Sequence, residues 1–223
     1  CSPTTNTLES LVSINSHIQN QDGAIGILSY SQKKFGITLT ESWYEKLQRW
    51  EEALGAYEKK MKQDPSSKEA FLGVLRCRFS LGDWERLNQE ATARWDAFDE
   101  SVQRSAASLA CASTWAVNDF EGMCKFVQVL PESTSDGSFF RAIHAIHLHQ
   151  HHLALHHIQM TRATMDTELT ALIGESYSRA YIPAIRVQML SDLEEIMEYA
   201  QCDAGDDGKR ERIKRSLTLR LKD

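Results

Sequence analysis

"WEEALGAYEKKM", residues 50–61, and "WERLNQEATARW", residues 84–95, are two copies of one helical pattern. In each copy, apolar residues recur at offsets 0, +3, +7 and +11, which places them on one stripe of an α-helix. The positions are Trp50, Ala53, Tyr57 and Met61 in the first copy and Trp84, Leu87, Ala91 and Trp95, each 34 residues later, in the second. A stripe that returns at this interval indicates an internal repeat of tetratricopeptide length.

Two further copies extend the repeat along the chain. Phe120, Met123 and Val127 restart the stripe 36 residues on, and His151, Ala154 and Ile158 restart it 31 residues later. Another apolar helical stretch precedes each stripe, and turn residues such as "SLGDW" (80–84) and "QDPSS" (63–67) separate them. One helix pair cannot bury its apolar stripe alone, but stacked pairs share a continuous core. The sequence therefore predicts an all-α, tetratricopeptide-like helix-turn-helix solenoid of about four to five repeats. Its predicted core includes Trp50, Ala53, Tyr57, Trp84, Leu87, Phe120, Met123, Ala154, Ile158 and Tyr177.

The composition is that of a soluble globular protein, with 42% apolar and 25% charged residues among 223. The net charge of −6 gives no basic field for nucleic acid, and no apolar run reaches the roughly 18 residues that span a bilayer. Five scattered cysteines without a C-x-x-C pair are typical of a reduced, cytosolic protein.

The expected organisation has four parts. Residues 1–10 are expected to be disordered or the start of a linker, and residues 11–200 to form the repeats. Residues 201–208, which include "CDAGDDG", read as an acidic loop. The basic residues 209–223, with Ile213, Leu217 and Leu221 at helical spacing, read as a truncated first helix of a following repeat. Since the chain starts at Cys1 without a methionine, we expect it to be a piece of a longer protein.

"GESYS", residues 174–178, brings Glu175, Ser176 and Tyr177 together and raises the question of a nucleophile. A serine nucleophile of the G-x-S-x-G kind needs a second glycine and a base, and the run provides neither. Glu175 and Arg179 instead have the i, i+4 spacing of a helical ion pair. We therefore predict a packing helix, kinked or divided by Pro183 near Tyr181, and no catalytic residue.

The histidine-rich run "HAIHLHQHHLALHH", residues 144–157, carries seven of the eight histidines. His144, His147 and His151 would share one face of a continuous helix, and His152 with His156 form an i, i+4 pair that could hold zinc or nickel. No cysteine or carboxylate in the run completes a ligand set. His147, His151, His152 and His156 are thus the metal candidates, although we predict neither a metal nor a cofactor. Several imidazoles together could also respond to pH.

Several segments resemble the FAT domain of the target-of-rapamycin protein kinases. "ELTALIGESYSRAYIPAIRVQMLSDLEEIMEY" (168–199) is the most specific of them, and "ESWYEKLQRWEEALGAYEKK" (41–60) follows the same family in the same order. The resemblance runs from about Leu11 to the end. The histidine cluster, Pro183 and the acidic loop depart from the family pattern.

The resemblance implies a non-catalytic scaffold segment of a giant Ser/Thr kinase, whose catalytic region lies elsewhere. Its implied partners are the kinase domain that the FAT repeats clamp, the flanking repeats and the regulatory subunits of a target-of-rapamycin complex. The implied location is the cytoplasm, with the parent complex peripheral at endomembranes. Two alternatives remain open: a free-standing tetratricopeptide adaptor that binds peptides in its groove, and a metal-handling protein.

Overall fold

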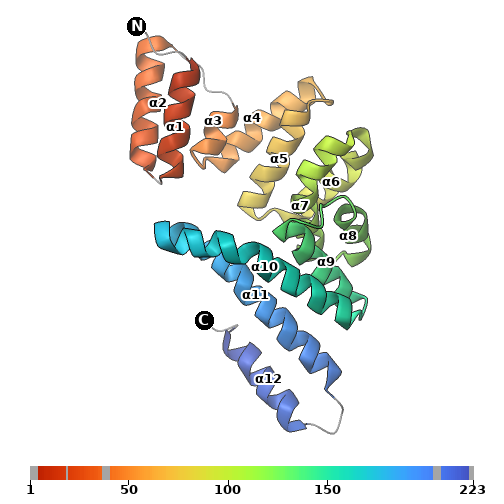
Figure 1. Cartoon of the computed structure of the whole chain (residues 1–223). Helices are drawn as coiled ribbons and strands as arrows, with labels where there is room; N and C mark the ends of the chain where they lie inside the picture. Colours follow the sequence, from red (N-terminus) through yellow and green to blue (C-terminus); the bar gives the residue numbers. More distant parts are fainter. Residues whose placement is uncertain (1–4, 19, 37–40, 203–206, 221–223) are drawn as a thin grey trace. The chain divides into compact units, whose positions relative to one another are not determined.

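The computed structural model describes residues 5–18, 20–36, 41–202 and 207–220 (Figure 1). These residues form α-helices, one short 3₁₀-helix and connecting turns, and they include no β-strand. The predicted all-α fold is confirmed. The chain divides into two compact units, residues 1–118 and 119–223.

Within both units, most helices pack against the next helix along the chain, and in the first unit α1 also contacts α3 and α5 contacts α7. Such nearest-neighbour packing is typical of a helical-repeat protein. The first unit contains α1 (Thr5–His17), α2 (Gln21–Phe35), α3 (Glu41–Lys46), α4 (Trp50–Gln63), α5 (Lys68–Leu81), α6 (Trp84–Arg94), η1 (Trp95–Ala97) and α7 (Glu100–Ala116). The second contains α8 (Phe120–Val127), α9 (Ser135–His147), α10 (His151–Glu175), α11 (Tyr177–Gln201) and α12 (Asp207–Arg220).

The first apolar cluster of the first unit joins α1, α2 and α3. Leu8 and Val12 lie one turn apart on α1 and are 3% and 0% exposed, packed with Leu28 and Trp43. The expectation that residues 1–10 are a linker or disordered is therefore wrong for residues 5–10, which begin α1. The i, i+4 spacing of Leu8 and Val12 was the helical signal that this expectation overlooked. Residues 1–4 lie outside the described residues.

The second cluster joins α4 and α5. Ala53, Tyr57 and Met61 of the predicted stripe are buried against Val74 and Cys77. Trp50, at the head of the stripe, is only partly buried and packs at the edge of this cluster. The stripe therefore lies on the buried face of α4, where the repeat pattern places it.

The turn inside each repeat uses a left-handed backbone residue. Gln48, Gly82, Asn118 and His149 have φ values of 58°, 71°, 59° and 56°. After Gln48, Gly82 and His149, the next amide donates to a carbonyl five residues back, as from Asp83 to Arg78, at 2.9 Å. This bond satisfies an orphan carbonyl at the helix end, as in a Schellman motif. The four turn residues are 34, 36 and 31 positions apart, which are the intervals of the stripes.

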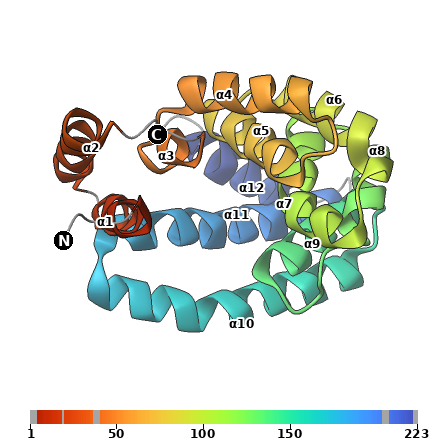
Figure 2. The same cartoon turned by 90° about the horizontal axis from the view of Figure 1, so that it is seen from above.

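The second unit contains two long helices, α10 and α11, that are joined at one end (Figure 2). The helices meet at Ser176, whose backbone is extended, with φ −157° and ψ 112°. The predicted division near Tyr181 is wrong, because α11 continues through Pro183. Gly174 weakens the end of α10, and a serine is a favoured residue before a helix start, so the break falls before the proline.

The residues on the two sides of the break at Ser176 do not share one buried face. Ala180 is 3% exposed, whereas Ile173 is 60% exposed. The other predicted core residues fall into three groups. Leu87, Met123, Ala154 and Ile158 are each 0% exposed; Trp84 and Phe120 are partly buried; the side chain of Tyr177 lies outside the described residues.

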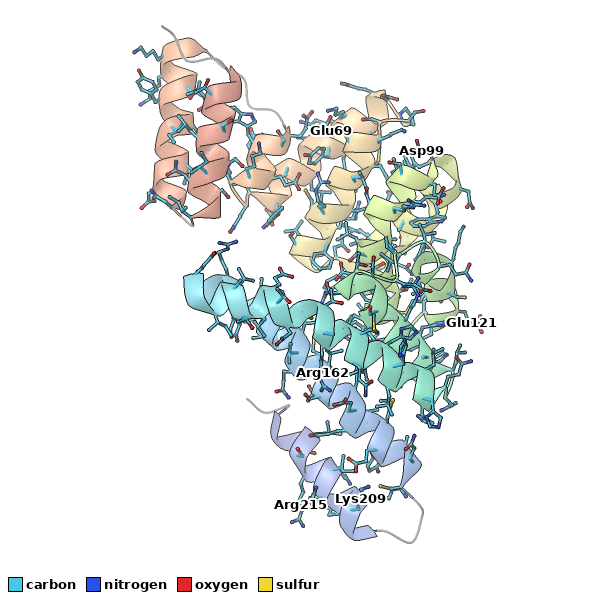
Figure 3. The ribbon with its side chains drawn as sticks, in the orientation of Figure 1. Glu69, Asp99, Glu121, Arg162, Lys209 and Arg215 are labelled. Atoms are coloured by element: carbon cyan, nitrogen blue, oxygen red, sulfur yellow. The ribbon has the colours of Figure 1, made fainter. Side chains whose placement is uncertain are left out.

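The basic tail forms α12, which packs against α11 through Lys209 and Glu198 at 2.7 Å (Figure 3). The Arg210 guanidinium lies 5.0 Å from the centre of the Tyr199 ring. Residues 203–206 of the expected acidic loop lie outside the described residues. Among the helices described, none is both long and apolar enough to cross a membrane.

Candidate functional site

A polar network connects three helices of the first unit. Glu45 of α3 accepts a hydrogen bond from the Tyr57 hydroxyl of α4 at 2.9 Å, and its two carboxylate oxygens accept from Nε and Nη2 of Arg76 on α5. A two-point pair of this kind fixes orientation as well as distance. The network therefore sets the angles between α3, α4 and α5.

Charge and burial act in opposite directions on the pKa of Glu45. Burial raises the pKa of this carboxyl, but the hydrogen bonds from Arg76 and Tyr57 outweigh burial and hold it below its ordinary value of 4.5. Burial, followed by the carboxylate of Glu45, raises the pKa of the Tyr57 hydroxyl. Glu45 is thus ionised, and Tyr57 remains a donor, across the neutral range.

Ion pairs also join the helices of the second unit. Both Nη atoms of Arg162 on α10 donate to Glu194 on α11, each at 2.6 Å, and Nη2 also reaches the Ser191 hydroxyl at 3.2 Å (Figure 3). Arg186 of α11 pairs with Asp136 at the start of α9, and its guanidinium lies 4.9 Å from the centre of the Phe139 ring. These contacts fix the α10–α11 hairpin on α9.

Sequence reasoning did not find these pairs, although a signal was present. Glu45 and Arg76 are 31 residues apart, and Arg162 and Glu194 are 32 apart. Opposite charges separated by about one repeat length lie on neighbouring helix pairs of a solenoid. A search for charges at the repeat interval would have found both.

Apolar side chains are exposed where α10 and α11 meet. We call this set, Ile173, Tyr181, Ile182 and Ile185, the tip surface; its members are 60%, 57%, 75% and 43% exposed. Isolated exposed apolar residues are ordinary, but a group at one end of a hairpin marks a surface that contacts another protein segment. The tip surface is therefore the candidate interaction site of the second unit.

The "GESYS" stretch lies beside the tip surface and has the geometry of a helix junction. Glu175 and Arg179, both exposed, approach to 3.5 Å across the junction. Ser176 is the residue between the two helices, and its amide donates to the Leu172 carbonyl at 2.8 Å. These contacts end one helix and start the next.

The histidine run is divided by the α9–α10 turn. His147 is on α9, where its ring stacks on Phe120 at 4.2 Å, and His151 is on α10 after the left-handed His149. A turn therefore separates His144 and His147 from His151, and the three do not share one face of a continuous helix. His152 and His156 are both exposed on α10. In the part of the chain that the structure describes, no three His, Cys, Asp or Glu side chains converge as metal ligands.

The helix pairs recur at an interval of about 34 residues, contain left-handed turns and are joined by ion pairs. These features define a tetratricopeptide-like helical-repeat protein. A comparison with protein families shows to which family of helical-repeat proteins the chain belongs. The FAT domain family matches residues 107–223. The chain belongs to this family, so the resemblance found in the sequence is confirmed.

The chain is similar to several target-of-rapamycin kinases. It is 40% identical over 193 residues to the serine/threonine-protein kinase tor1 of Schizosaccharomyces pombe, matching 86% of this chain and 8% of that protein. It is 41% identical over 192 residues to mTor of Drosophila melanogaster, again covering 86% and 8%. With TOR2 of Saccharomyces cerevisiae, the identity is 36% over 219 residues, 98% of this chain and 9% of the relative. The chain thus spans less than a tenth of each of these relatives.

Proposed function

We propose that this chain is a non-catalytic scaffold segment of a target-of-rapamycin-type Ser/Thr protein kinase. One observation carries the proposal: kinases of this class match 86–98% of this chain while the match fills only 8–9% of each of them. The FAT domain family matches residues 107–223. In this proposal, the catalytic region of the parent kinase lies in another part of that protein.

The scaffold acts by holding helices at fixed angles. The Glu45 network and the Arg162–Glu194 pair oppose bending between neighbouring helices, so a displacement at one end of a unit is passed along it as a shift of whole helices. In this proposal the segment helps to clamp the kinase domain, and regulatory subunits of the complex bind its surfaces. The parent works in the cytoplasm and associates peripherally with endomembranes.

The tip surface is the part of the second unit proposed to contact the rest of the parent chain. Ile182, 75% exposed, is its most accessible member. Burying four large apolar side chains would give about 1.5–3 kcal/mol for each one fully covered. A covered tip surface would therefore contribute several kcal/mol to the clamp.

Photo-crosslinking in the native protein tests this contact. A benzoylphenylalanine at position 182 should cross-link to residues of the same polypeptide in or beside its kinase domain, identified by mass spectrometry. The same group in place of the exposed Lys62 on α4 is the control. Equal cross-linking at both positions would contradict a specific contact at the tip surface.

The size of the native polypeptide separates the two main functions. An antibody raised to residues 41–199 should detect a band far above the 25.3 kDa of this chain, and the precipitated protein should phosphorylate serine or threonine. A band near 25 kDa would instead support a free-standing adaptor. In that case the peptide ligand would be sought in the cleft lined by Glu45, Lys46, Trp50 and Arg76.

A further inference from the structure

A cleft of about 570 Å³ lies among α8, α9 and α10 in the second unit. This volume is within the range of small-ligand sites, about 300–1,000 Å³. Four of its lining side chains are cationic or can become so, namely Arg141, His144, His156 and His157. Among the described residues that line it, Glu132 is the one acid, and it is 84% exposed at the rim. The composition of the lining favours an anion.

Arg141 provides a fixed positive charge in this cleft. Its side chain is only 14% exposed, and its nearest carboxylate oxygen, on Glu132, is 4.0 Å from Nε. Backbone carbonyls hold the guanidinium: Nη1 donates to Gly137 at 3.0 Å and Nη2 to Leu130 at 2.6 Å. Carbonyl groups orient the guanidinium without neutralising its charge, so a positive potential remains in the cleft.

Burial and neighbouring positive charges both lower the pKa of two histidines of the cleft, His144 and His157. Burial, followed by the charge of His147, holds the pKa of His144 below its ordinary value of 6.5. Burial also lowers the pKa of His157, and His156 and Arg141 lower it further, while Glu132 acts in the opposite direction. The protonated forms of His144 and His157 are thus disfavoured by the protein groups that surround them. An anion bound beside these two imidazoles would act in the opposite direction and raise the pKa of both.

We propose that the cleft among α8, α9 and α10 binds a small oxyanion of the phosphate class, and that His144 and His157 take up protons as the anion binds. Arg141 supplies the constant charge, and Gln128 and Gln150 at the wall supply neutral amide donors. Binding and protonation are linked. For every proton taken up on binding, the affinity for the anion therefore rises about tenfold when the pH falls by one unit. The inference concerns a ligand of the chain itself and does not depend on the proposed role in a kinase.

Sulfate is a suitable probe, because it is a tetrahedral dianion that does not titrate near neutral pH. We would titrate sulfate into the 223-residue chain by calorimetry at pH 5.5, 6.5 and 7.5, with ionic strength held constant and a chelator present. Two buffers of different ionisation enthalpy at each pH give the number of protons taken up. We expect affinity to rise at least about tenfold between pH 7.5 and 5.5, with proton uptake at the lower values. Undetectable binding at pH 5.5, or binding without proton uptake, would overturn the proposal.

Matched variants assign the protons to residues. The double variant His144→Gln, His157→Gln keeps polar side chains of similar size and should lose the pH dependence while retaining weak binding through Arg141. His152→Gln removes an exposed histidine that does not line the cleft and should behave like the wild type. An unchanged pH slope in the double variant would contradict the assignment. Parallel titrations with inorganic phosphate and O-phosphoserine then show whether the tighter ligand is the free ion or a phosphorylated side chain.

Discussion

Gly73 allows the Tyr57 ring to lie on the backbone of α5. A Cβ added at position 73 would lie 2.6 Å from three ring carbons, Cε1, Cε2 and Cζ. Non-bonded heavy atoms essentially never come this close to a Cβ. Tyr57 is 1% exposed, and its hydroxyl is held by Glu45, so the ring cannot move aside without breaking that hydrogen bond. Gly73→Ala is therefore expected to distort the contact between α4 and α5.

The magnitude follows from two opposing effects. Overpacking a buried site costs about 1–3 kcal/mol, while alanine is better than glycine inside a helix by about 1 kcal/mol. Gly73→Ala should thus lower the free energy of unfolding by up to about 2 kcal/mol. Gly55 is the matched control, because it is the sixth residue of α4 as Gly73 is of α5, and a Cβ there meets nothing within 4 Å. Gly55→Ala should raise the free energy of unfolding by about 0.5–1 kcal/mol.

Urea unfolding of each variant, followed by circular dichroism at 222 nm, measures the difference. A second comparison uses Tyr57→Leu, which keeps an apolar side chain but removes the three carbons that a Cβ at position 73 would meet. In that background, Gly73→Ala should become stabilising. If Gly73→Ala stabilises the wild-type chain as much as Gly55→Ala does, the close approach of the ring to α5 is not what requires glycine.

Three further predictions concern the turns, the charge network and the hairpin. Gln48→Gly should stabilise the chain and Gly82→Ala destabilise it, each by about 1 kcal/mol in thermal unfolding, because both positions have positive φ. The lowered pKa of Glu45 contributes stability that is present above its unfolded pKa, near 4.5, and is lost as the pH falls through the lower folded pKa. The unfolding free energy of Glu45→Gln, measured from pH 7 to 3, should therefore fall less steeply than that of the wild type; parallel curves would refute this. Arg162→Ala should cost about 1 kcal/mol, a small value because the pair with Glu194 is about a third exposed, and should speed amide exchange in α10 and α11 but not in α4.

Much of the fold could be predicted because one repeat constrains the next. The stripe from Trp50 to Met61 identifies a helix, and its return at Trp84 shows which face of the helix is buried. The turn residues carry the same period, although only Gly82 and Asn118 are a glycine or an asparagine, the types most favoured at a left-handed position. Gln48 and His149 occupy equivalent positions without any local signal, so the period itself predicts their conformation better than propensity does.

The structure was hardest to predict from the sequence where several local effects compete. At 174–183 a glycine, a serine and a proline each disfavour or interrupt a helix, and only packing decides that the break falls at Ser176. The cleft could not be predicted from the histidine run alone. Its decisive charge, Arg141, lies before the run, and a turn within the run separates its histidines.

Function in this chain is expected at the positions that the repeat leaves unconstrained. On α10, Ala154 and Ile158 are both 0% exposed, and the stripe requires them to be apolar and of a particular size. His156 and His157 lie between them in sequence but face the cleft, where neither the helix nor the core depends on an imidazole. A repeat protein can therefore acquire a binding site without changing its core. Accordingly, substitutions at His156 and His157 should alter anion affinity with little change in unfolding free energy, whereas changes at Ile158 should do the reverse.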